Sequence, residues 1–407
     1  MRIAHLAFDQ KFIPFAQDIF EEAYPGNNTW FLLDETREPL RFVRNPKKFN
    51  IVTRRRLQSQ DCLATINNNR ILIVHAMIPA FADVVKRMSK DLVVMWIGWG
   101  YEYYSYLESD FGDLILPETT VAWQRALAVE NATPKGAVFH LKSLLRPAYR
   151  ALKSAINKQQ SQATIQTVAG RIDLCCVSPS EMPLLKRAFP DFRAKHYQLH
   201  YFSTEDTLAR GPVKMEGPDI LLGNSATPEN NHLEAMNLLH RIGIEGRKII
   251  APLSYGHSHY AEEVCRIGSR LFGSNFTPLR HYLPIDEYHQ LLSTCGTVIM
   301  NHRRQAAMGN ISAALYKGAR IILREENPIY QTYTGLGVPL NSVHSIEDSP
   351  SAALIPLTHG ERSRNREIVG AYMSRTNLIK AIRGLAAYCD PASLPEKIDV
   401  LEAAGHG

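Results

Sequence analysis

The sequence predicts two Rossmann-like, doubly wound α/β domains that face each other across a cleft. Its 407 residues are too many for one comfortable core and suit two domains of ~150 to 200 residues each. Short apolar runs alternate with helix-like segments from end to end, a pattern typical of mainly parallel sheets. Such sheets bind ligands beyond the carboxyl ends of their strands, so the residues that follow each strand are the candidate site residues.

The expected strands fall into two sets on either side of a polar linker at residues 203–217, which carries Gly211-Pro212 and Gly217-Pro218. The first set covers residues 2–8, 30–33, 50–53, 71–75, 92–96 and 172–177, and the second covers 220–222, 248–253, 297–300 and 320–323. We therefore expect an N-terminal domain over residues 1–203 and a C-terminal domain over residues 218–373. Residues 374–407 are expected to form a helical segment that packs back on the N-terminal domain.

The composition argues against several classes of protein. No apolar run reaches the roughly 18 residues that a transmembrane helix needs. The apolar run of residues 2–8 is followed by Asp9 and Lys11, which indicates a first strand rather than a signal peptide, so we expect a cytoplasmic protein. None of the six cysteines forms a Cys-x-x-Cys pair, and zinc is not expected.

The net charge of +6 is modest but unevenly distributed. Residues 41–56 contain no acidic side chain and seven basic ones, namely Arg41, Arg44, Lys47, Lys48, Arg54, Arg55 and Arg56. Residues 141–158 place further basic side chains at helical spacing, opposite an apolar face. This second stretch is either a solvated helix that packs on its own domain or a surface helix on an anionic membrane. Nucleic acid is not an expected partner, because aromatic residues do not interleave with these charges.

The first candidate ligand loop follows the strand at residues 220–222. Gly223, Asn224 and Ser225 turn the chain there, and the glycine allows the backbone to approach a phosphate. Thr227 is expected to be the N-cap of the following helix, with a proline at the first helical position. An ordinary strand-to-helix turn is the alternative interpretation.

A second candidate loop holds Tyr255 and Gly256 at the end of the next strand. The tyrosine ring could stack on a nucleobase or cap a sugar, while the glycine makes the turn. His257 and His259 follow, but no carboxylate or cysteine partner is apparent, so we expect no metal site there.

A third candidate loop precedes an apolar helix that is expected over residues 311–316. It contains Arg304 and Gln305, and then Gly309 and Asn310 at the expected helix start. Arginines beside a helix start suit a diphosphate, because they add cationic donors to the free helical amides. A basic surface loop is the other interpretation.

A fourth candidate loop holds Glu326 and Asn327 after the last strand. The carboxylate of Glu326 could accept a hydrogen bond from a sugar hydroxyl of the nucleotide sugar. It could equally be an ordinary acidic residue at a helix N-terminus.

The first half of the chain contains a run of aromatic residues that is a candidate binding surface for an acceptor substrate. The aromatic run is Trp96, Trp99, Tyr101, Tyr103, Tyr104 and Tyr106. Aromatic faces stack on sugar rings, although core packing accounts for some of these side chains, and we expect Trp99, Tyr101 and Tyr103 to contact the acceptor. His75 and Glu102 lie at the ends of adjacent strands, and each is a candidate general base for an acceptor hydroxyl.

Taken in order, these segments resemble the TDP-N-acetylfucosamine:lipid II N-acetylfucosaminyltransferase family of enterobacterial common antigen assembly. The matching positions in the second half are Leu221 to Ser225, Asn231, His232, Ala251, Pro252, Tyr255, Glu262 to Val264, Asp286, Tyr288, Leu291, Leu292, Cys295, Arg304, Gln305, Gly309, Glu326 to Pro328 and Gln331. In the first half they are His75, Trp96, Trp99, Gly100 and Tyr103 or Tyr104, and Glu102 stands where the family has an aspartate. The chain departs from the family at Ala306, Ala307 and Asn310.

The resemblance implies a GT-B glycosyltransferase. Its C-terminal domain would bind a dTDP-sugar, and its N-terminal domain would bind a polyprenyl-diphosphate-linked saccharide at the inner face of the bacterial inner membrane. Donor-site roles are implied for Gly223, Asn224, Tyr255, Arg304, Gln305, Gly309 and Glu326, and acceptor-side roles for His75 and Glu102. No Asp-x-Asp motif is present in the sequence, so we expect no essential metal and no cofactor.

Two alternatives remain open on the sequence. A nucleotide-sugar epimerase-like enzyme with a similar two-domain body would release an epimer or free sugar without any acceptor. A non-catalytic sugar-nucleotide-binding component of a polysaccharide assembly complex would bind the nucleotide without turnover. Fold alone does not separate these functions.

Overall fold

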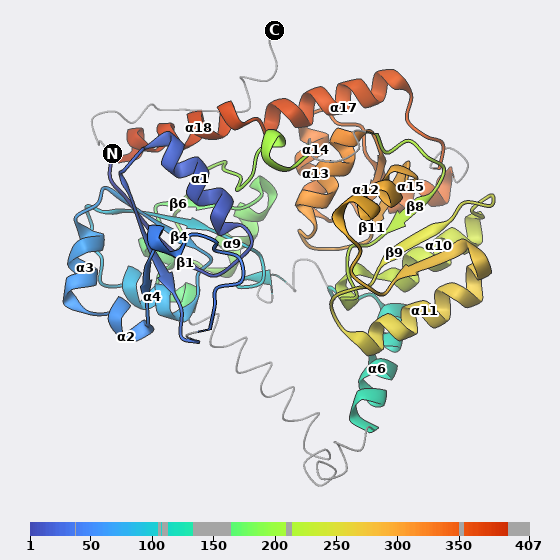
Figure 1. Cartoon of the computed structure of the whole chain (residues 1–407), viewed down its shortest axis with the longest axis horizontal. Coiled ribbons are helices and arrows are strands. Elements are labelled where there is room, and N and C mark those ends of the chain that lie inside the picture. Colours follow the sequence, from blue (N-terminus) through green and yellow to red (C-terminus); the bar gives the residue numbers. More distant parts are fainter. Residues whose placement is uncertain are drawn as a thin grey trace. The chain divides into compact units, whose positions relative to one another are not determined.

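The computed structural model describes residues 1–36, 38–104, 107, 113–132, 164–208, 214–349 and 354–389. The chain divides into two compact units, each built on its own parallel sheet (Figure 1). Unit 1 comprises Met1–Leu107, Ser154–Asp206 and Ala371–Gly407, and unit 2 comprises Glu108–Lys153 and Thr207–Gly370. The predicted α/β class with two parallel-sheet domains is confirmed.

Within the described residues, the sheet of unit 1 has seven parallel strands in the order β3-β2-β1-β4-β5-β6-β7. Their bounds are β1 Ile3–Phe8, β2 Asn28–Leu33, β3 Asn50–Val52, β4 Ile71–His75, β5 Val93–Ile97, β6 Leu174–Cys176 and β7 Lys195–His196. The central strands β1 and β4 are buried almost throughout, as expected for a parallel sheet covered on both faces. The strand order reverses between β1 and β4, where doubly wound sheets bind their ligands.

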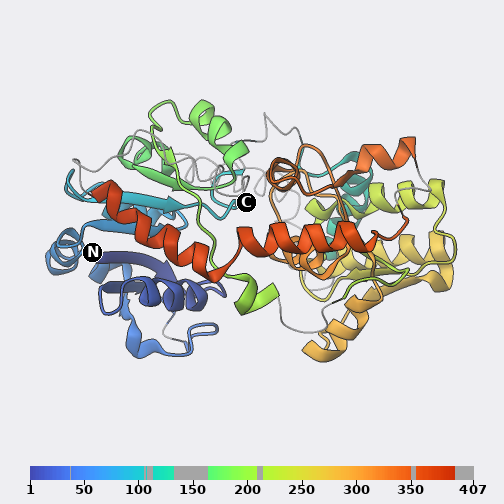
Figure 2. The same cartoon turned by 90° about the horizontal axis from the view of Figure 1, so that it is seen from above.

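The described helices of unit 1 are α1 Ile13–Ala23, α2 Arg54–Leu57, α3 Gln60–Asn67, α4 Pro79–Val85, α9 Met182–Ala188 and α18 Arg375–Gly384. α18 comes from the far end of the chain and lies beside α1 (Figure 2). Leu378 and Ile382 of α18 join Phe20 of α1 in one apolar cluster, and Arg375 forms an ion pair with Glu22. The described part of the C-terminal segment thus belongs to unit 1.

Within the described residues, the sheet of unit 2 has six parallel strands in the order β10-β9-β8-β11-β12-β13. Their bounds are β8 Ile220–Leu222, β9 Ile249–Pro252, β10 Phe276–Leu279, β11 Thr297–Met300, β12 Arg320–Leu323 and β13 Asn341–Ser342. The helices are α6 Pro117–Ala132, α10 His232–Ile242, α11 Ser258–Phe272, α12 Ile285–Ser293, α13 Met308–Lys317, α14 Pro328–Gly335 and α15 Val343–Asp348, and α17 His359–Tyr372 runs to the boundary of the unit.

The boundary between the units differs from the expected one at α6. We expected residues 1–203 to form one domain, but α6 packs on α10 and α11 of unit 2. Thr119 Oγ1 donates to Glu234 Oε2 at 2.6 Å, and the Leu116 amide donates to Asn231 Oδ1 at 2.8 Å. These polar contacts hold the start of α6 against α10, so the helix joins a domain that follows it in the sequence.

Three short strands were not predicted from the sequence. β7 and β13 have two residues each, and both lie at sheet edges together with β10. An edge strand pairs on one side and is only partly buried, so it needs no continuous apolar run. The apolar signal was therefore strong for the central strands and weak for the edges.

Candidate functional site

The four candidate loops of unit 2 meet at one edge of its sheet. They follow β9, β8, β11 and β12, which are neighbours in that order. Because parallel strands end at the same edge, these loops lie side by side. Gly223 begins the loop after β8 with a φ of +69°, and a Cβ there would lie only 2.7 Å from Nε2 of His232. The tertiary structure thus brings the four predicted donor loops together.

Asn230 organises the loop after β8. Its Oδ1 accepts the Asn224 amide at 2.9 Å, and its Nδ2 donates to Thr227 Oγ1 at 2.7 Å and to Ser225 Oγ at 3.1 Å. Asn230 is 1% exposed, so these bonds form away from water and hold the loop in one shape. Ser225 is also buried, and its hydroxyl serves this network.

Thr227 and Pro228 take the N-cap and first positions of a helical turn, as expected, but this turn is a short 3-10 helix and not the start of the following α-helix. A short 3-10 turn, Pro228–Asn230, comes first, and α10 begins only at His232. Asn231 joins the two with a left-handed φ of 50°, which asparagine tolerates better than most residues. The hydroxyl of Thr227 is used by the Asn230 side chain and makes no capping bond.

The loop after β9 is hydrogen-bonded to the loop after β8. The Ala226 amide donates to the Tyr255 carbonyl at 2.8 Å, and the His257 amide donates to the Ala226 carbonyl at 2.9 Å. Asn224 Nδ2 also donates to the Tyr255 hydroxyl at 3.2 Å. The Tyr255 side chain is 57% exposed, so its ring is accessible to a nucleobase or a sugar.

Gly256 permits the close approach of these two loops. Its φ is +111°, and a Cβ there would lie 2.6 Å from the carbonyl carbon and oxygen of Ala226. Gly256→Ala is therefore expected to lower the free energy of unfolding by about 1–3 kcal/mol and to push the loops apart. Gly246→Ala is the matched control, because Gly246 has a φ of +77° but no atom within 4 Å of its Cβ position. Denaturant unfolding measures both variants, and equal losses would mean that backbone strain alone explains the effect.

The loop after β11 holds two arginines beside acidic and carbonyl oxygens. Arg304 Nε donates to Glu229 Oε2 at 2.8 Å, and its Nη2 pairs with the same carboxylate. Arg303 Nη1 donates to the Asp113 carbonyl at 2.9 Å, while its Nη2 lies 3.6 Å from Glu326 Oε1. Both guanidinium groups directly before α13 thus already have a carboxylate partner, Glu229 or Glu326.

α13 begins earlier than expected, at Met308, so Gly309 and Asn310 lie in its first turn. Ala307 precedes the helix with a left-handed φ of 57° and provides no side-chain cap, and the first turn contains no acidic residue. The first amides of a helix have no intrahelical partner, and the helix dipole favours an anion in front of them. Together with the two arginines of the preceding loop, this helix start forms a site suited to a diphosphate.

Glu326 lies among arginines at the end of β12. Arg324 Nη2 donates to its Oε1 at 3.2 Å, while its Oε2 is buried without a hydrogen bond from any described residue. Burial raises the pKa of Glu326, but its own backbone amide and Arg324 outweigh burial and hold the pKa below its usual value. The carboxylate is therefore ionised at neutral pH, and its Oε2 is able to accept a hydroxyl hydrogen bond.

Asn327 has a structural role in place of the expected ligand contact. It is 0% exposed, and its Nδ2 donates to the carbonyls of Arg304 at 3.0 Å and His302 at 3.1 Å. Its Oδ1 accepts the Ile329 amide at 2.9 Å and so caps α14. All polar atoms of the side chain are used inside the protein, so Asn327 holds the Arg304 loop in position.

Several residues that assemble the site were not among the predicted site residues. Asn231 Nδ2 donates to the Asn301 carbonyl at 3.1 Å, and Asn301 Nδ2 returns a bond to the Asn231 carbonyl at 2.9 Å. This reciprocal pair joins the loops after β8 and β11, and Glu229 adds its ion pair with Arg304. The sequence signal for these roles is the polar run at residues 229–231, although its place after Pro228 favours the first turn of a helix.

His75, a predicted general base, is enclosed in the core of unit 1. It is 0% exposed, with Nδ1 2.9 Å from the Tyr201 hydroxyl and Nε2 3.2 Å from Nδ1 of His5. Burial lowers the pKa of His75 to about 3, so the ring is neutral at neutral pH. Both ring nitrogens are engaged, and the hydroxyl of Tyr201 in turn accepts the indole N–H of Trp99 at 2.6 Å. The geometry therefore gives His75 a supporting position behind Trp99.

Glu102, the other predicted base, follows β5 and is also nearly buried, at 3% exposed, but one of its carboxylate oxygens has no hydrogen bond from any described residue. Its Oε1 accepts the Trp99 amide at 2.9 Å and the Trp96 indole N–H at 3.3 Å. Its Oε2 is buried and has no hydrogen-bond partner among the described residues. Burial raises the pKa of Glu102 to about 7, against the opposing effect of these hydrogen bonds. A carboxyl group with a pKa near neutral pH is suited to accept a proton during catalysis.

The aromatic run divides between the core and the surface. Tyr103 is 0% exposed and donates its hydroxyl to Glu181 Oε1 at 3.0 Å, so it does not reach an acceptor, contrary to the expectation. Tyr101 is 56% exposed and Trp99 is half-buried, which leaves these two predicted acceptor contacts accessible. Tyr106 lies outside the described residues.

The first basic stretch lies on the surface. All seven basic side chains of residues 41–56 are exposed. The second basic stretch, residues 141–158, lies outside the described residues. Within the described ranges, no helix has both the length and the apolar character that a membrane span requires.

The second half of the chain matches a known family of enzymes. Residues 186–349 match the family described as 4-alpha-L-fucosyltransferase, glycosyl transferase group 56. The matched stretch includes all four candidate loops, from Gly223 to Asn327. The match confirms the resemblance inferred from the sequence.

Several solved structures have a similar fold over almost the whole chain. Sucrose-phosphate synthase from Thermosynechococcus elongatus shares 10% identity over 97% of this chain and 100% of its own, with a TM-score of 0.58. HepE from Anabaena, solved in complex with UDP, shares 10% identity over 95% of this chain and 100% of its own, with a TM-score of 0.60. The alpha,alpha-trehalose 6-phosphate synthase from Burkholderia multivorans shares 11% identity over 98% of this chain and 99% of its own, with a TM-score of 0.53. At such identities the likeness shows the fold alone, and the GT-B architecture is confirmed.

Proposed function

We propose a specific transfer reaction for this chain, which is a glycosyltransferase with the GT-B fold and whose residues 186–349 match glycosyl transferase group 56. The enzyme moves a deoxyamino sugar or a related hexose from a nucleoside diphosphate, with dTDP as the expected nucleotide. The acceptor is a saccharide linked to a polyprenyl diphosphate, so the product is an extended lipid-linked oligosaccharide for a bacterial surface polysaccharide.

The observation that carries this proposal is the anion site at the start of α13. Arg303 and Arg304 lie in the loop that enters this helix, and its first turn has neither a side-chain cap nor an acidic residue. The exposed ring of Tyr255 and the free Oε2 of Glu326 add contacts for a nucleobase and a sugar hydroxyl at the same sheet edge. These are the parts that recognition of a nucleoside diphosphate sugar requires.

The reaction forms a bond between the acceptor hydroxyl oxygen and the anomeric carbon as the bond from that carbon to the diphosphate breaks. The electron pair leaves with the nucleoside diphosphate, and the arginines and α13 amides stabilise its developing negative charge. The hydroxyl proton passes to Glu102, while His75 stays neutral and supports Trp99 through Tyr201. Because cationic side chains supply the charge that a metal supplies in other enzymes, we propose no metal or cofactor.

The acceptor and its membrane are assigned to unit 1. Trp99 and Tyr101 present accessible aromatic surface for sugar rings at the edge where Glu102 lies. The exposed basic residues 41–56 suit an anionic membrane, since each basic residue near such a surface adds ~1 kcal/mol of attraction. The proposed location is therefore the cytoplasmic face of the inner membrane, with the protein bound peripherally.

A thermal-shift panel tests the nucleotide part of the proposal. dTDP, UDP, GDP and ADP are compared, each with magnesium and with a chelator. We expect dTDP to give the largest rise in melting temperature, because a ligand that binds only the folded state stabilises it by mass action. The rise should not depend on magnesium. A larger shift with UDP or GDP would change the donor, and no shift with any nucleotide would remove the basis of the proposal.

Product analysis with a polyprenyl-diphosphate-linked saccharide then tests the acceptor. Transfer to the lipid-linked saccharide supports the proposal. An epimer or free sugar formed without acceptor would indicate the epimerase-like alternative. Nucleotide binding without turnover on a panel of lipid-linked saccharides would indicate a binding component.

A further inference from the structure

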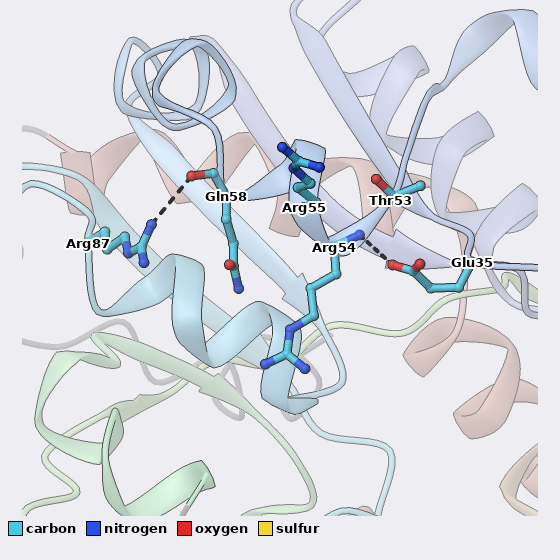
Figure 3. Close-up of a pocket in the computed structure, with 6 residues that line it drawn as sticks. All are labelled: Glu35, Thr53, Arg54, Arg55, Gln58 and Arg87. Carbon is cyan, nitrogen blue, oxygen red and sulfur yellow. Dashed lines mark hydrogen bonds between the residues drawn. The ribbon is translucent and has the colours of Figure 1, made fainter.

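We infer that unit 1 holds a second anion site, separate from the donor loops, which binds the diphosphate of the acceptor. The site is an open hollow of about 710 Å³, lined by Glu35, Thr53, Arg54, Arg55, Gln58 and Arg87 (Figure 3). The identity of its ligand rests on the proposed function. The hollow itself is defined by unit 1 alone.

The acidic groups at this hollow already have partners. Arg54 Nη2 pairs with Asp83 Oδ2 at 2.7 Å, and Gln58 Nε2 donates to the same oxygen at 3.2 Å. The carboxylate of Glu35 accepts the backbone amide of Arg54 (Figure 3). These carboxylates therefore fix Arg54 and the entry to α2, and neither is paired with the other two arginines of the hollow.

Arg55 and Arg87 supply the unused donors. Within the described residues, Arg55 has no hydrogen bond or ion pair, and Arg87 uses only Nη1, which is 3.3 Å from the Gln58 carbonyl (Figure 3). A guanidinium group carries five N–H donors in a fixed fork. Two such groups therefore line the hollow with most of their donors and their full charge available.

This donor set selects a phosphate group over other ligands. A guanidinium fork matches the spacing of phosphate oxygens and binds two of them at once. None of the residues that line the hollow is aromatic, so it lacks the stacking surface that sugar rings and nucleobases use. Two cationic forks facing one open hollow suit a diphosphate better than a neutral saccharide.

The position of the hollow fits an acceptor whose sugars extend toward Glu102. Glu35 follows β2 and Thr53 follows β3, at the same carboxyl edge of the sheet where Glu102 follows β5. Four strand spacings separate β3 from β5 in the sheet order, which is about 19 Å. A saccharide that separates the diphosphate from the reacting hydroxyl would bridge this distance.

Binding of farnesyl diphosphate to the full chain tests the inference. The double variant Arg55→Ala with Arg87→Ala is expected to bind this short polyprenyl diphosphate at least about tenfold more weakly than the parent. The matched control is Lys90→Ala with Lys186→Ala, which removes the same charge from exposed positions elsewhere on unit 1. The control should bind like the parent. Equal losses in the two double variants would overturn the site, because they would show attraction by net charge alone.

Two further measurements complete the test. The first distinguishes the acceptor diphosphate from a lipid headgroup as the ligand, and the second distinguishes failure of this inference from failure of the proposed function. Phosphatidylglycerol vesicles should bind the hollow variant only slightly more weakly than the parent, because Arg55 is one of the seven basic residues of the stretch 41–56. A loss of vesicle binding as large as that of farnesyl diphosphate binding would overturn the inference in favour of a lipid headgroup. The dTDP-induced rise in melting temperature should be unchanged in the hollow variant. If no nucleotide binds the parent but the arginine-dependent farnesyl diphosphate binding remains, the proposed transfer fails and the diphosphate site stands.

Discussion

Arg304→Ala is expected to lower kcat/KM for the nucleotide sugar by about 100-fold or more and to weaken nucleoside diphosphate binding by about tenfold. The Arg304 guanidinium lies just before α13 and directs Nε and Nη2 to one carboxylate, that of Glu229. Both donors share the single oxygen Oε2 of Glu229, whereas a diphosphate offers several oxygens and more charge, so we expect it to take over these donors from Glu229. Steady-state kinetics and nucleotide titration measure the two effects separately.

Glu229→Gln distinguishes ligand binding from loop ordering. If Arg304 only ordered the loop through Glu229, the two variants would lose affinity equally. We expect Glu229→Gln to retain or strengthen nucleotide binding, because it releases the Arg304 guanidinium. Arg266→Ala is the control, since it removes a surface arginine whose partner is Glu263 at 2.7 Å. Matching losses in Arg304→Ala and Glu229→Gln would contradict the assignment.

Glu102→Gln is expected to lower kcat by about 100-fold or more while nucleotide affinity stays close to that of the parent. Glutamine keeps an oxygen for the Trp99 amide and the Trp96 indole N–H, but it cannot accept the hydroxyl proton at the position of Oε2. Glu38→Gln is the matched control at an exposed position of unit 1. Turnover of Glu102→Gln near the parent value would remove Glu102 from the mechanism.

The pH dependence of the parent should report the same group. Because burial raises the pKa of Glu102 to about 7, kcat is expected to rise as the pH passes through about 7 from the acid side. The folded state holds this proton more tightly than the unfolded chain, so ionisation opposes folding as the pH rises toward that value. Glu102→Gln removes the free-energy cost of ionising this buried group. We therefore expect its melting temperature at alkaline pH to be no lower than that of the parent.

His75→Gln separates the supporting residue from the base. Burial lowers the pKa of His75 to about 3, far below the pH at which kcat is expected to rise. Replacing His75 should therefore lower kcat without moving the midpoint of the pH profile. A profile that lost its acid limb in His75→Gln and kept it in Glu102→Gln would reverse the two roles.

The central strands could be predicted from the sequence almost residue by residue. The expected strands at residues 71–75, 220–222, 297–300 and 320–323 coincide with β4, β8, β11 and β12. Strands buried on both faces of a parallel sheet must be apolar on both sides, so they stand out as short continuous runs. The residues that follow such runs are local in sequence, which is why Gly223, Tyr255, Arg304 and Glu326 were found as candidates.

Which of the candidate side chains are exposed and which are enclosed was decided by the tertiary structure. His75 and Tyr103 have the chemistry of site residues, but burial and the partners Tyr201 and Glu181 turn them inward. The side-chain amide of Asn327 likewise forms its hydrogen bonds with groups of the protein itself.

The sequence by itself determined the fold class, the central strands and the loops at their carboxyl ends, because apolar runs and turn residues are local signals. The tertiary structure alone decided the membership of α6 and the roles of the candidate side chains. Thr119 meets Glu234 across 115 positions, and His75 meets Tyr201 across 126. Contacts over such separations depend on how the whole domain buries its surface, and no local pattern records them.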